Sequence, residues 1–304
     1  MTPHSHWRVA LITPVRDEEM YIGEMIESIA AQQNRPAKWV IVDDGSTDQT
    51  PEIIASYARR HSFIHLVQRP PRRERKAGGE SAITHALSHI NLAEFDFLAR
   101  FDADLVFEKD YLTGMLQEFS SDATLGIAGG GLYVRRNGGS YLETAPEYHV
   151  RGALKMYRRE CFTGIGGLST QIGWDTIDEV SAWTKGWKTK SFFQYRVIHR
   201  RPTGQGIKLS RICWERGKAE YLTWSHPAFV LTKSLKVARE TRSLSAPLCF
   251  LAGFVWPYCK GYERRQDRAF VKARREQQIG RMTSALKERS RLIIRFEGSQ
   301  RPVD

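Results

Sequence analysis

The sequence predicts an α/β protein, a single α/β/α sandwich with a mostly parallel central sheet. Short apolar runs alternate with amphipathic stretches between residues 7 and 101, and polar or acidic residues follow several of those runs at once. The chain has 304 residues, of which 41% are hydrophobic, so it can bury a large core. It contains no low-complexity block or fixed-period repeat, which excludes disordered and solenoid classes.

The first hundred residues predict four strands and three helices in alternation. In chain order these are a strand at 9–13, a helix at 18–33, a strand at 39–42, a helix at 50–60, a strand at 64–67, a helix at 80–90 and a strand at 95–101. Asp48 or Thr50 can cap the second helix, with Pro51 in its first turn. We expect ligands to bind beyond the carboxyl ends of these strands, as in other open α/β sheets.

The rest of the chain changes character twice. Residues 126–173 are Gly-rich and predict strands and loops around a cleft, whereas the chain beyond about residue 226 is apolar and basic and ends in a helix at about 266–291. We expect a domain at 1–230 that binds a nucleotide and an extension at 231–304. The extension is expected to be partly helical and to bind a membrane surface or an acceptor.

Charge is divided unevenly along the chain. The net charge is +12, but residues 1–152 carry 16 Lys and Arg against 21 Asp and Glu, and residues 153–304 carry 30 against 13. The 15-residue apolar stretch at 244–258 is too short to span a bilayer, yet it is followed by a strongly basic region. Apolar insertion beside positive charge predicts a peripheral protein on an anionic membrane surface.

Compartment is predicted from two further features. No secretory signal pattern is found at the amino terminus, and the four cysteines lie far apart, without metal-ligand spacing. We therefore expect reduced thiols in a cytoplasmic protein that rests on the inner face of the membrane.

Three acidic segments can carry chemistry. Residues 13–19 and 42–48 end the first two predicted strands, where carboxylates accept hydrogen bonds from ribose hydroxyls or a base N–H. Asp102 and Asp104 can share a hard divalent cation with the diphosphate of a substrate. A third segment, 173–179, places three carboxylates on one helical face, which favours a general base there.

Together these segments resemble family 2 glycosyltransferases of the GT-A fold, over about residues 7–230. The resemblance rests on Pro14–Glu19, Val42–Asp48, Asp102–Asp104, Gly152–Phe162 with Ile165–Gly167, and Trp174–Asp175 with Gly186–Trp187. It implies inverting transfer of a hexose-type sugar from a UDP, GDP or dTDP donor to an acceptor hydroxyl. The acceptor is expected to be a glycan or lipid-linked, in polysaccharide or glycolipid assembly.

The resemblance also implies roles for individual residues. The nucleotide and donor sugar would be bound by Pro14, Val15, Arg16, Glu18, Asp43, Asp44, Arg75, Lys76, Gly78, Asp102 and Ala103. Asp104 of the DxD motif and His199 would bind Mg²⁺ or Mn²⁺, and Arg200 and Arg201 would clamp phosphate oxygens. The acceptor side would be lined by Gly152, Ala153, Arg158 and Trp174.

The general base has two candidates. Relatives usually carry Glu-Asp where this chain has Trp174-Asp175, but ten residues separate Asp175 from Gly186, which is the family's spacing. Asp175 is therefore the first choice, and Asp178 the alternative. The base would deprotonate the acceptor hydroxyl as it attacks the anomeric carbon, so that configuration inverts without a covalent intermediate.

Two other function classes compete with this one. A catalytically inactive scaffold that binds a nucleotide sugar is the alternative, whereas a nucleic-acid partner is not expected because the amino half is acidic and carries no recognition motif. Near the carboxyl end, Gln278-Ile-Gly-Arg281 is similar to the Gln-x-x-Arg-Trp motif of processive synthases. Met282 replaces the Trp, so the similarity does not predict processivity.

Overall fold

The chain divides into two compact units in the computed structural model, which describes residues 7–70, 80–136, 139–143, 145–169, 171–201, 207–264 and 267–298. The first unit comprises residues 1–170 and 174–205, and the second comprises 171–173 and 206–304. The boundary expected at residue 230 lies inside helix α8 (Pro227–Thr241). The division falls earlier because helix α7 (Leu209–Leu222) packs against the helices that follow it.

The first unit is built on a sheet with the order β3-β2-β1-β4-β8-β6-β9-β5, to which β7 is added beside β6. Its strands are β1 (Val9–Val15), β2 (Lys38–Asp43), β3 (Ile64–Gln68), β4 (Phe97–Phe101), β5 (Leu105–Phe107), β6 (Leu125–Arg136), β7 (Gly139–Leu142), β8 (Leu154–Arg158) and β9 (Lys188–His199). Strands β3, β2, β1 and β4 are parallel, while β8 runs antiparallel to both β4 and β6. The sheet is thus parallel in its first half and mixed in its second.

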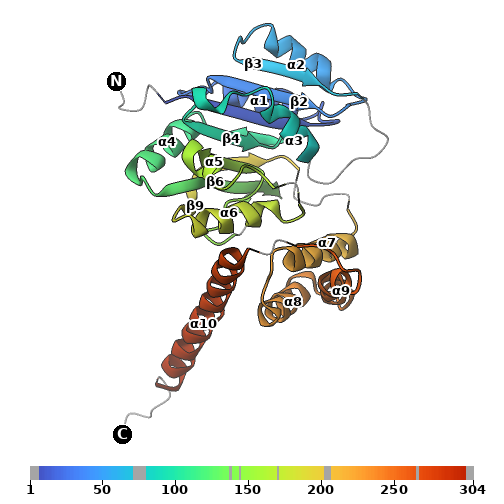
Figure 1. Ribbon diagram of the computed structural model, residues 1–304, viewed down its shortest axis with the longest axis vertical. Coiled ribbons are helices and arrows are strands. Elements are labelled where there is room, and N and C mark those ends of the chain that lie inside the picture. Colours follow the sequence, from blue (N-terminus) through green and yellow to red (C-terminus); the bar gives the residue numbers. More distant parts are fainter. Residues whose placement is uncertain are drawn as a thin grey trace. The chain divides into compact units, whose positions relative to one another are not determined.

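Helices cover both faces of this sheet (Figure 1). One face packs against α1 (Ile22–Ala30), α2 (Thr50–Ala58) and α4 (Tyr111–Ser121), and the other against α3 (Glu80–Leu87), α5 (Arg159–Gly164) and α6 (Trp174–Thr184). Alternate residues of β1 enter opposite layers, since Leu11 belongs to the first core and Ile12 to the second. The α/β sandwich expected from the sequence is confirmed.

The seven elements expected before residue 101 are present in the expected order. Helix α1 buries Ile22, Met25, Ile26 and Ile29, the spacing of a single helical face. Pro51 lies in the first turn of α2, where its missing N–H costs no hydrogen bond. These local signals fix the ends of β1 and β2, on which the candidate site is built.

The second unit is helical and consists of α7, α8, α9 (Ser245–Cys259) and α10 (Arg268–Gly298). Helices α7 and α9 lie close together at two glycines. A Cβ atom on Gly217 would lie 1.9 Å from the carbonyl oxygen of Phe250, and one on Gly253 would lie 2.2 Å from that of Trp214. Among the described residues, no helix is both long and apolar enough to cross a bilayer.

Helix α10 is held to the other helices of this unit through Gln278. Its side chain is fully buried, its Nε2 donates to Ser225 Oγ at 2.8 Å, and its Oε1 accepts from the backbone N–H of His226 at 2.8 Å. Both the oxygen and the nitrogen of the amide are therefore hydrogen-bonded within the helical unit. The segment similar to Gln-x-x-Arg-Trp thus has a structural role here.

Candidate functional site

Two loops meet at the carboxyl ends of β1 and β2. The N–H of Asp17 donates to Ser46 Oγ at 2.9 Å, and the N–H of Thr47 donates to Asp17 Oδ1 at 2.8 Å. Asp17 takes a left-handed backbone conformation, with φ of 54°. A further bond joins the N–H of Gln49 to Glu19 Oε2 at 3.0 Å. The two acidic segments noted in the sequence therefore form one rigid rim at this edge of the sheet.

Asp43 and Asp44 have different surroundings within this rim. Asp43 is buried and accepts from both the N–H and the hydroxyl of Ser46, at 3.0 and 2.5 Å. Burial raises the pKa of Asp43, although these hydrogen bonds oppose the rise. Asp44 instead pairs with Arg69 NH1 at 2.7 Å. Asp43 therefore shapes the turn, and Asp44 presents a carboxylate at the end of β2.

The other residues of the segment 13–19 make separate contacts. Pro14 and Val15 lie in β1, where the side chain of Val15 is part of the core and its carbonyl accepts from the N–H of Asp44 at 2.9 Å. Arg16 follows β1, with its Nε 3.6 Å from Asp17 Oδ2. Glu18 is buried and forms an ion pair with Arg201.

The Asp-Ala-Asp segment lies between β4 and β5. The carboxylate of Asp102 is 37% exposed and pairs with Arg100 NH2 at 2.8 Å, whereas Asp104 is buried. Ala103 packs in the core. Strand β9 brings two partners to Asp104 Oδ2, namely His199 Nε2 at 3.5 Å and Arg201 Nε at 3.3 Å.

His199 lies between two carboxylates, because its Nδ1 also contacts Glu143 Oε1 at 3.3 Å. Burial lowers the pKa of the imidazole, but the hydrogen bonds with Asp104 and Glu143 outweigh it and raise the pKa to about 9. Within the described parts of the chain, no group of three or more His, Cys, Asp and Glu side chains is arranged to hold a metal ion. Asp104 and His199 are adjacent, and with a pKa of about 9 the His199 imidazole carries a proton at neutral pH.

Helix α6 presents three carboxylates in different environments. Asp178 and Glu179 are buried, and Lys155 Nζ lies 2.8 Å from Asp178 Oδ1 and 3.1 Å from Glu179 Oε1. Tyr157 also donates to Asp178 Oδ2 at 2.5 Å. The Asp175 side chain is 35% exposed. Asp175 is therefore the one acid of this helix whose side chain is partly exposed to solvent.

Trp174 links this helix to the Asp-Ala-Asp segment. The Arg100 guanidinium carbon lies 4.8 Å from the centroid of the Trp174 ring, and Arg100 also bonds to the carbonyl of Gly152. The carbonyl of Ala153 accepts from the N–H of Asp102 at 2.9 Å. Arg100 thus connects the carboxylate of Asp102 with the residue that precedes Asp175.

Residues 10–171, more than half of the chain, match the model for glycosyl transferase family 2. The chain belongs to this family. Among curated family 2 relatives, poly-β-1,6-N-acetyl-D-glucosamine synthase of Staphylococcus epidermidis is 21% identical, over 75% of this chain and 59% of the relative. β-Monoglucosyldiacylglycerol synthase of Synechocystis sp. is 28% identical, over 59% of this chain and 37% of the relative. The chain thus spans about half the length of these relatives.

Solved structures of similar fold are glycosyltransferases. The mannosyltransferase PcManGT from Pyrobaculum calidifontis, in complex with GDP-Man and Mn²⁺, has a TM-score of 0.54 and 18% identity, covering 92% of this chain and 77% of that one. S. aureus TarS 1–349 in complex with UDP-GlcNAc has a TM-score of 0.54 and 15% identity, covering 85% and 93%. The GT-A fold expected from the sequence is confirmed.

Arg158, expected on the acceptor side, lies away from these groups. Arg158 faces Phe97 across β8 and β4, whereas Asp102 follows the other end of β4. The Arg158 guanidinium donates to the carbonyls of Phe119 at 2.6 Å and Leu125 at 3.1 Å. It therefore stabilises the end of the sheet opposite Asp102. Arg75, Lys76 and Gly78 lie outside the described residues. Arg200 donates its backbone N–H to the carbonyl of Asp104 at 2.9 Å, while its side chain pairs with Glu24 of α1.

Three side chains in this family 2 site were not predicted from the sequence. Lys155 lies inside a buried strand, Glu143 follows β7, and His149 lies in an irregular segment. A lysine flanked by apolar residues in a predicted strand is a signal that could have revealed Lys155, since buried lysines require acidic partners. Neither Glu143 nor His149 stands in a pattern that marks it.

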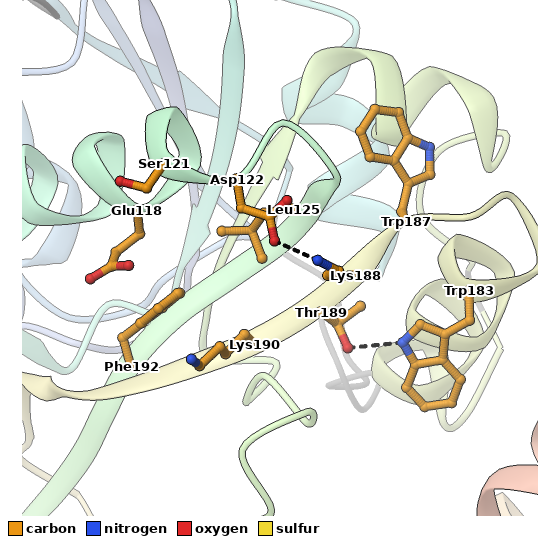
Figure 2. Close-up of a pocket in the computed structure, with 10 residues that line it drawn as sticks. All are labelled: Glu118, Ser121, Asp122, Leu125, Trp183, Trp187, Lys188, Thr189, Lys190 and Phe192. Atoms are coloured by element: carbon orange, nitrogen blue, oxygen red, sulfur yellow. Dashed lines mark hydrogen bonds and ion pairs between the residues drawn. The ribbon is translucent and has the colours of Figure 1, made fainter.

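A pocket of about 390 Å³ lies apart from these residues, between α4, α6 and the beginning of β9 (Figure 2). It is lined by Glu118, Ser121, Asp122, Leu125, Trp183, Trp187, Lys188, Thr189, Lys190 and Phe192. Lys188 pairs with Asp122 at 2.9 Å, and Trp183 Nε1 donates to Thr189 Oγ1 at 2.9 Å. None of the predicted site residues lines this pocket. The candidate site therefore lies elsewhere, beyond the carboxyl ends of β1, β2 and β4.

Proposed function

We propose that this chain is an inverting glycosyltransferase that transfers a sugar from a nucleotide-diphosphate sugar to an acceptor hydroxyl, with Asp175 as general base. The observation that carries the proposal is the contrast within α6, where Asp175 is 35% exposed while the side chain of Asp178 is fully buried and paired with Lys155. A base must reach its substrate, so Asp175 is preferred over Asp178. The relatives that make poly-N-acetylglucosamine and a glucosyl lipid support polysaccharide or glycolipid assembly as the setting.

The donor is proposed to bind along the rim and the Asp-Ala-Asp segment. Asp44 is positioned to accept hydrogen bonds from the base or ribose, while Pro14, Val15 and Asp43 hold the rim in shape. Asp102, with 37% of its side chain exposed, would face the ribose or the donor sugar. Complexes of structural neighbours with GDP-Man and with UDP-GlcNAc support a nucleotide sugar in this fold.

Asp104 and His199 are the proposed ligands of Mg²⁺ or Mn²⁺. Their facing atoms lie 3.5 Å apart, and the cation would displace the proton of His199, with its other positions taken by water and substrate phosphates. When bound, the cation would neutralise charge on the departing diphosphate. The complex of PcManGT with Mn²⁺ supports a divalent ion, and Arg201 stands beside Asp104 to bind phosphate oxygens.

The chemical step is proposed as a single displacement. Asp175 accepts the proton of the acceptor hydroxyl while that oxygen forms a bond to the anomeric carbon. The bond from that carbon to the phosphate oxygen breaks on the opposite side, and the nucleoside diphosphate leaves with the electron pair. Lys155 Nζ accepts no proton in this step; it donates to the backbone carbonyl of Asp175 at 2.5 Å and so fixes the first turn of α6.

Donor binding is tested by thermal shift with UDP-glucose, UDP-GlcNAc, GDP-mannose and dTDP-glucose, each with Mg²⁺ or Mn²⁺. We expect one nucleotide to raise the Tm in a metal-dependent way, because a ligand that binds the native state stabilises it. Asp104→Ala should lose the shift. Asp110→Ala, an exposed aspartate at the start of α4 without a capping bond, is the matched control and should keep it.

Turnover is tested as nucleotide release from that donor with N-acetylglucosamine oligosaccharides or diacylglycerol vesicles as acceptor. Asp175→Asn should bind the donor like the wild type and lose at least 100-fold in kcat. Equal turnover by wild type and Asp175→Asn would exclude Asp175 as the base. Donor binding by wild type without any release would favour the alternative, a catalytically inactive scaffold.

The second unit carries a surface that supports a membrane location. Helix α9 contains no charged residue, and its outer face exposes Leu248, Val255 and Trp256. Leu235 of α8 is 72% exposed. Lys260 Nζ lies 4.9 Å from the Trp256 ring, which places a positive charge beside the apolar face. Exposed apolar side chains beside aromatic and basic ones are typical of proteins at an anionic bilayer surface.

This surface is proposed to dock on an anionic bilayer and to bring the enzyme to a lipid-linked acceptor. In flotation, wild type should rise with phosphatidylglycerol vesicles and remain below with phosphatidylcholine vesicles. Leu248→Asp with Val255→Asp should abolish flotation. Tyr141→Asp, which changes an exposed apolar residue of β7 in the first unit, is the matched control and should float like wild type. Wild type that never floats would overturn the docking proposal and leave the donor assays untouched.

A further inference from the structure

His149 lies between two carboxylates of α6. Its Nδ1 is 2.9 Å from Glu179 Oε2, and its Nε2 is 3.9 Å from Asp175 Oδ2. No other Lys, Arg or His nitrogen among the described residues lies within 4 Å of the Asp175 carboxylate. The imidazole is thus the neighbour that can hold this carboxylate in one orientation.

The backbone around His149 is fixed by β9. Ser191 Oγ donates to the carbonyl of His149 at 2.8 Å, and the N–H of Ser191 donates to the carbonyl of Glu147 at 2.6 Å. Thr189 Oγ1 donates to the carbonyl of Tyr148 at 2.5 Å. The irregular segment is therefore anchored to β9 at three successive residues that end at His149, so the ring enters the site from a fixed position.

Glu179 fixes the orientation of the ring. Its carboxylate is buried, accepts from the N–H of Val150 at 2.7 Å, and lies 3.1 Å from Lys155 Nζ. With these partners Glu179 cannot turn away from His149 without breaking other contacts. Nδ1 must donate to such a carboxylate, and in the imidazolium form of the ring Nε2 carries a second proton that is directed at Asp175.

We propose that His149 is a positioning residue that holds the Asp175 carboxylate toward the acceptor hydroxyl. This inference rests on the proposed role of Asp175 as the base. Imidazole Nε2–H and the carboxylate face each other across 3.9 Å, a distance that a rotation of the exposed Asp175 side chain closes to a hydrogen bond. The series of contacts Glu179–His149–Asp175 is thereby connected, through Glu179, to the buried Lys155 of β8.

Two substitutions test the contacts of the two ring nitrogens one at a time. His149→Asn keeps an N–H near the Nδ1 position, so the contact with Glu179 survives and the one with Asp175 is lost. His149→Gln keeps an N–H near Nε2 and loses the one toward Glu179. If His149 positions Asp175, the Asn variant should melt like wild type and lose about 10- to 100-fold in kcat, with donor KM unchanged. The Gln variant should keep more of kcat and melt lower.

A double-mutant comparison shows whether His149 acts through Asp175. Nucleotide release is measured, in the assay with oligosaccharide or diacylglycerol acceptors, for His149→Asn, Asp175→Asn and the two combined. Non-additive losses support the proposal, because the combined variant should be no slower than Asp175→Asn alone. Wild-type kcat in His149→Asn, or fully additive losses, would overturn it. An active Asp175→Asn single variant would instead refute the proposed base, so the two failures are distinguishable.

Discussion

Lys155 and Asp178 form a fully buried ion pair, with Nζ 2.8 Å from Oδ1, directly behind the exposed Asp175. Burial raises the pKa of Asp178, although Lys155 and Tyr157 oppose the rise. Lys155 also donates to the carbonyl of Asp175 and pairs with Glu179. The pair therefore fastens α6 to β8 and sets the position from which the first turn of α6 enters the site.

Asp178→Asn is expected to lower the free energy of unfolding by about 3 kcal/mol, because it leaves the Lys155 charge buried with one partner fewer. Denaturant unfolding measures the loss. The variant that remains folded at low temperature should still bind donor, since Asp178 does not face it. A stable Asp178→Asn protein with no turnover would instead mark Asp178 as the base.

The double variant Lys155→Met with Asp178→Leu tests the second partner of Lys155. It removes both charges of the pair but leaves the buried carboxylate of Glu179 without the lysine that lies 3.1 Å away, so this protein should be less stable than Asp178→Asn. A double variant that is more stable than the single one would show that Glu179 does not need Lys155.

Local sequence signals account for the parallel half of the sheet. Apolar runs, Pro51 and the acidic residues after each strand sufficed to predict β1 to β4 in order, because each of these elements carries its own local sequence pattern. The acidic triplet of α6 was also recognised. Its division into one exposed and two buried carboxylates depends on Lys155 and Tyr157 of β8, and such pairing across distant segments leaves no periodic pattern in the sequence.

Contacts between residues far apart in the sequence explain the other differences between prediction and structure. Arg158 matches the family's acceptor segment, yet its antiparallel register with Phe97 takes it to the far end of the sheet. Register is set by the pairing of β8 with β4, which no single motif shows. The compact units divide near residue 206 and not at the expected 230 for a similar reason, since the packing of Gly217 of α7 against α9 appears only in three dimensions.

Gly152→Ala should impair catalysis more than stability. A Cβ atom at this position would lie 2.9 Å from Cζ2 of Trp174 and 3.4 Å from Cβ of Asp175, so the start of α6 must shift. We expect kcat to fall at least tenfold, because small displacements of a base are costly, while donor binding persists. Nucleotide release and thermal shift measure the two effects.

Gly164→Ala is the matched control for this substitution. Apart from its chain neighbours and the backbone of α5, no atom of the described residues lies within 4 Å of the added Cβ, so activity should equal that of wild type. Equal activity of Gly152→Ala and wild type would show that Trp174 can move without disturbing Asp175.

Gln278→Leu tests the structural role of the segment similar to Gln-x-x-Arg-Trp. The substitution leaves the N–H of His226 and the hydroxyl of Ser225 without their amide partner, at a cost of about 1–3 kcal/mol. Urea unfolding should show this loss, whereas kcat should stay within twofold. Unchanged stability with lost turnover would contradict the structural role. Gly280→Ala, with open space around its Cβ, serves as control and should not destabilise the chain.

Glu220 should make the second unit sensitive to acid. Burial raises the pKa of its carboxyl, but Lys233 and Arg274 outweigh this and lower the pKa to about 2. A pKa that is lower in the folded than in the unfolded state gives stability that is complete above the unfolded value and is lost as pH falls toward 2. Glu220→Gln should therefore be less stable than wild type at pH 7, by about 3 kcal/mol.

The difference in Tm between wild type and Glu220→Gln should then shrink as pH falls from 4.5 to 2, because protonation removes the same charge that the substitution removes. Thermal melts of both proteins over this range measure it. Glu276→Gln is the control, because Glu276 is exposed and its contact with Lys272, at 3.9 Å, is a weak surface ion pair. The Tm of this variant should follow that of wild type at every pH. A difference between wild type and Glu220→Gln that is constant across the range would show that packing, and not charge, gives Glu220 its contribution.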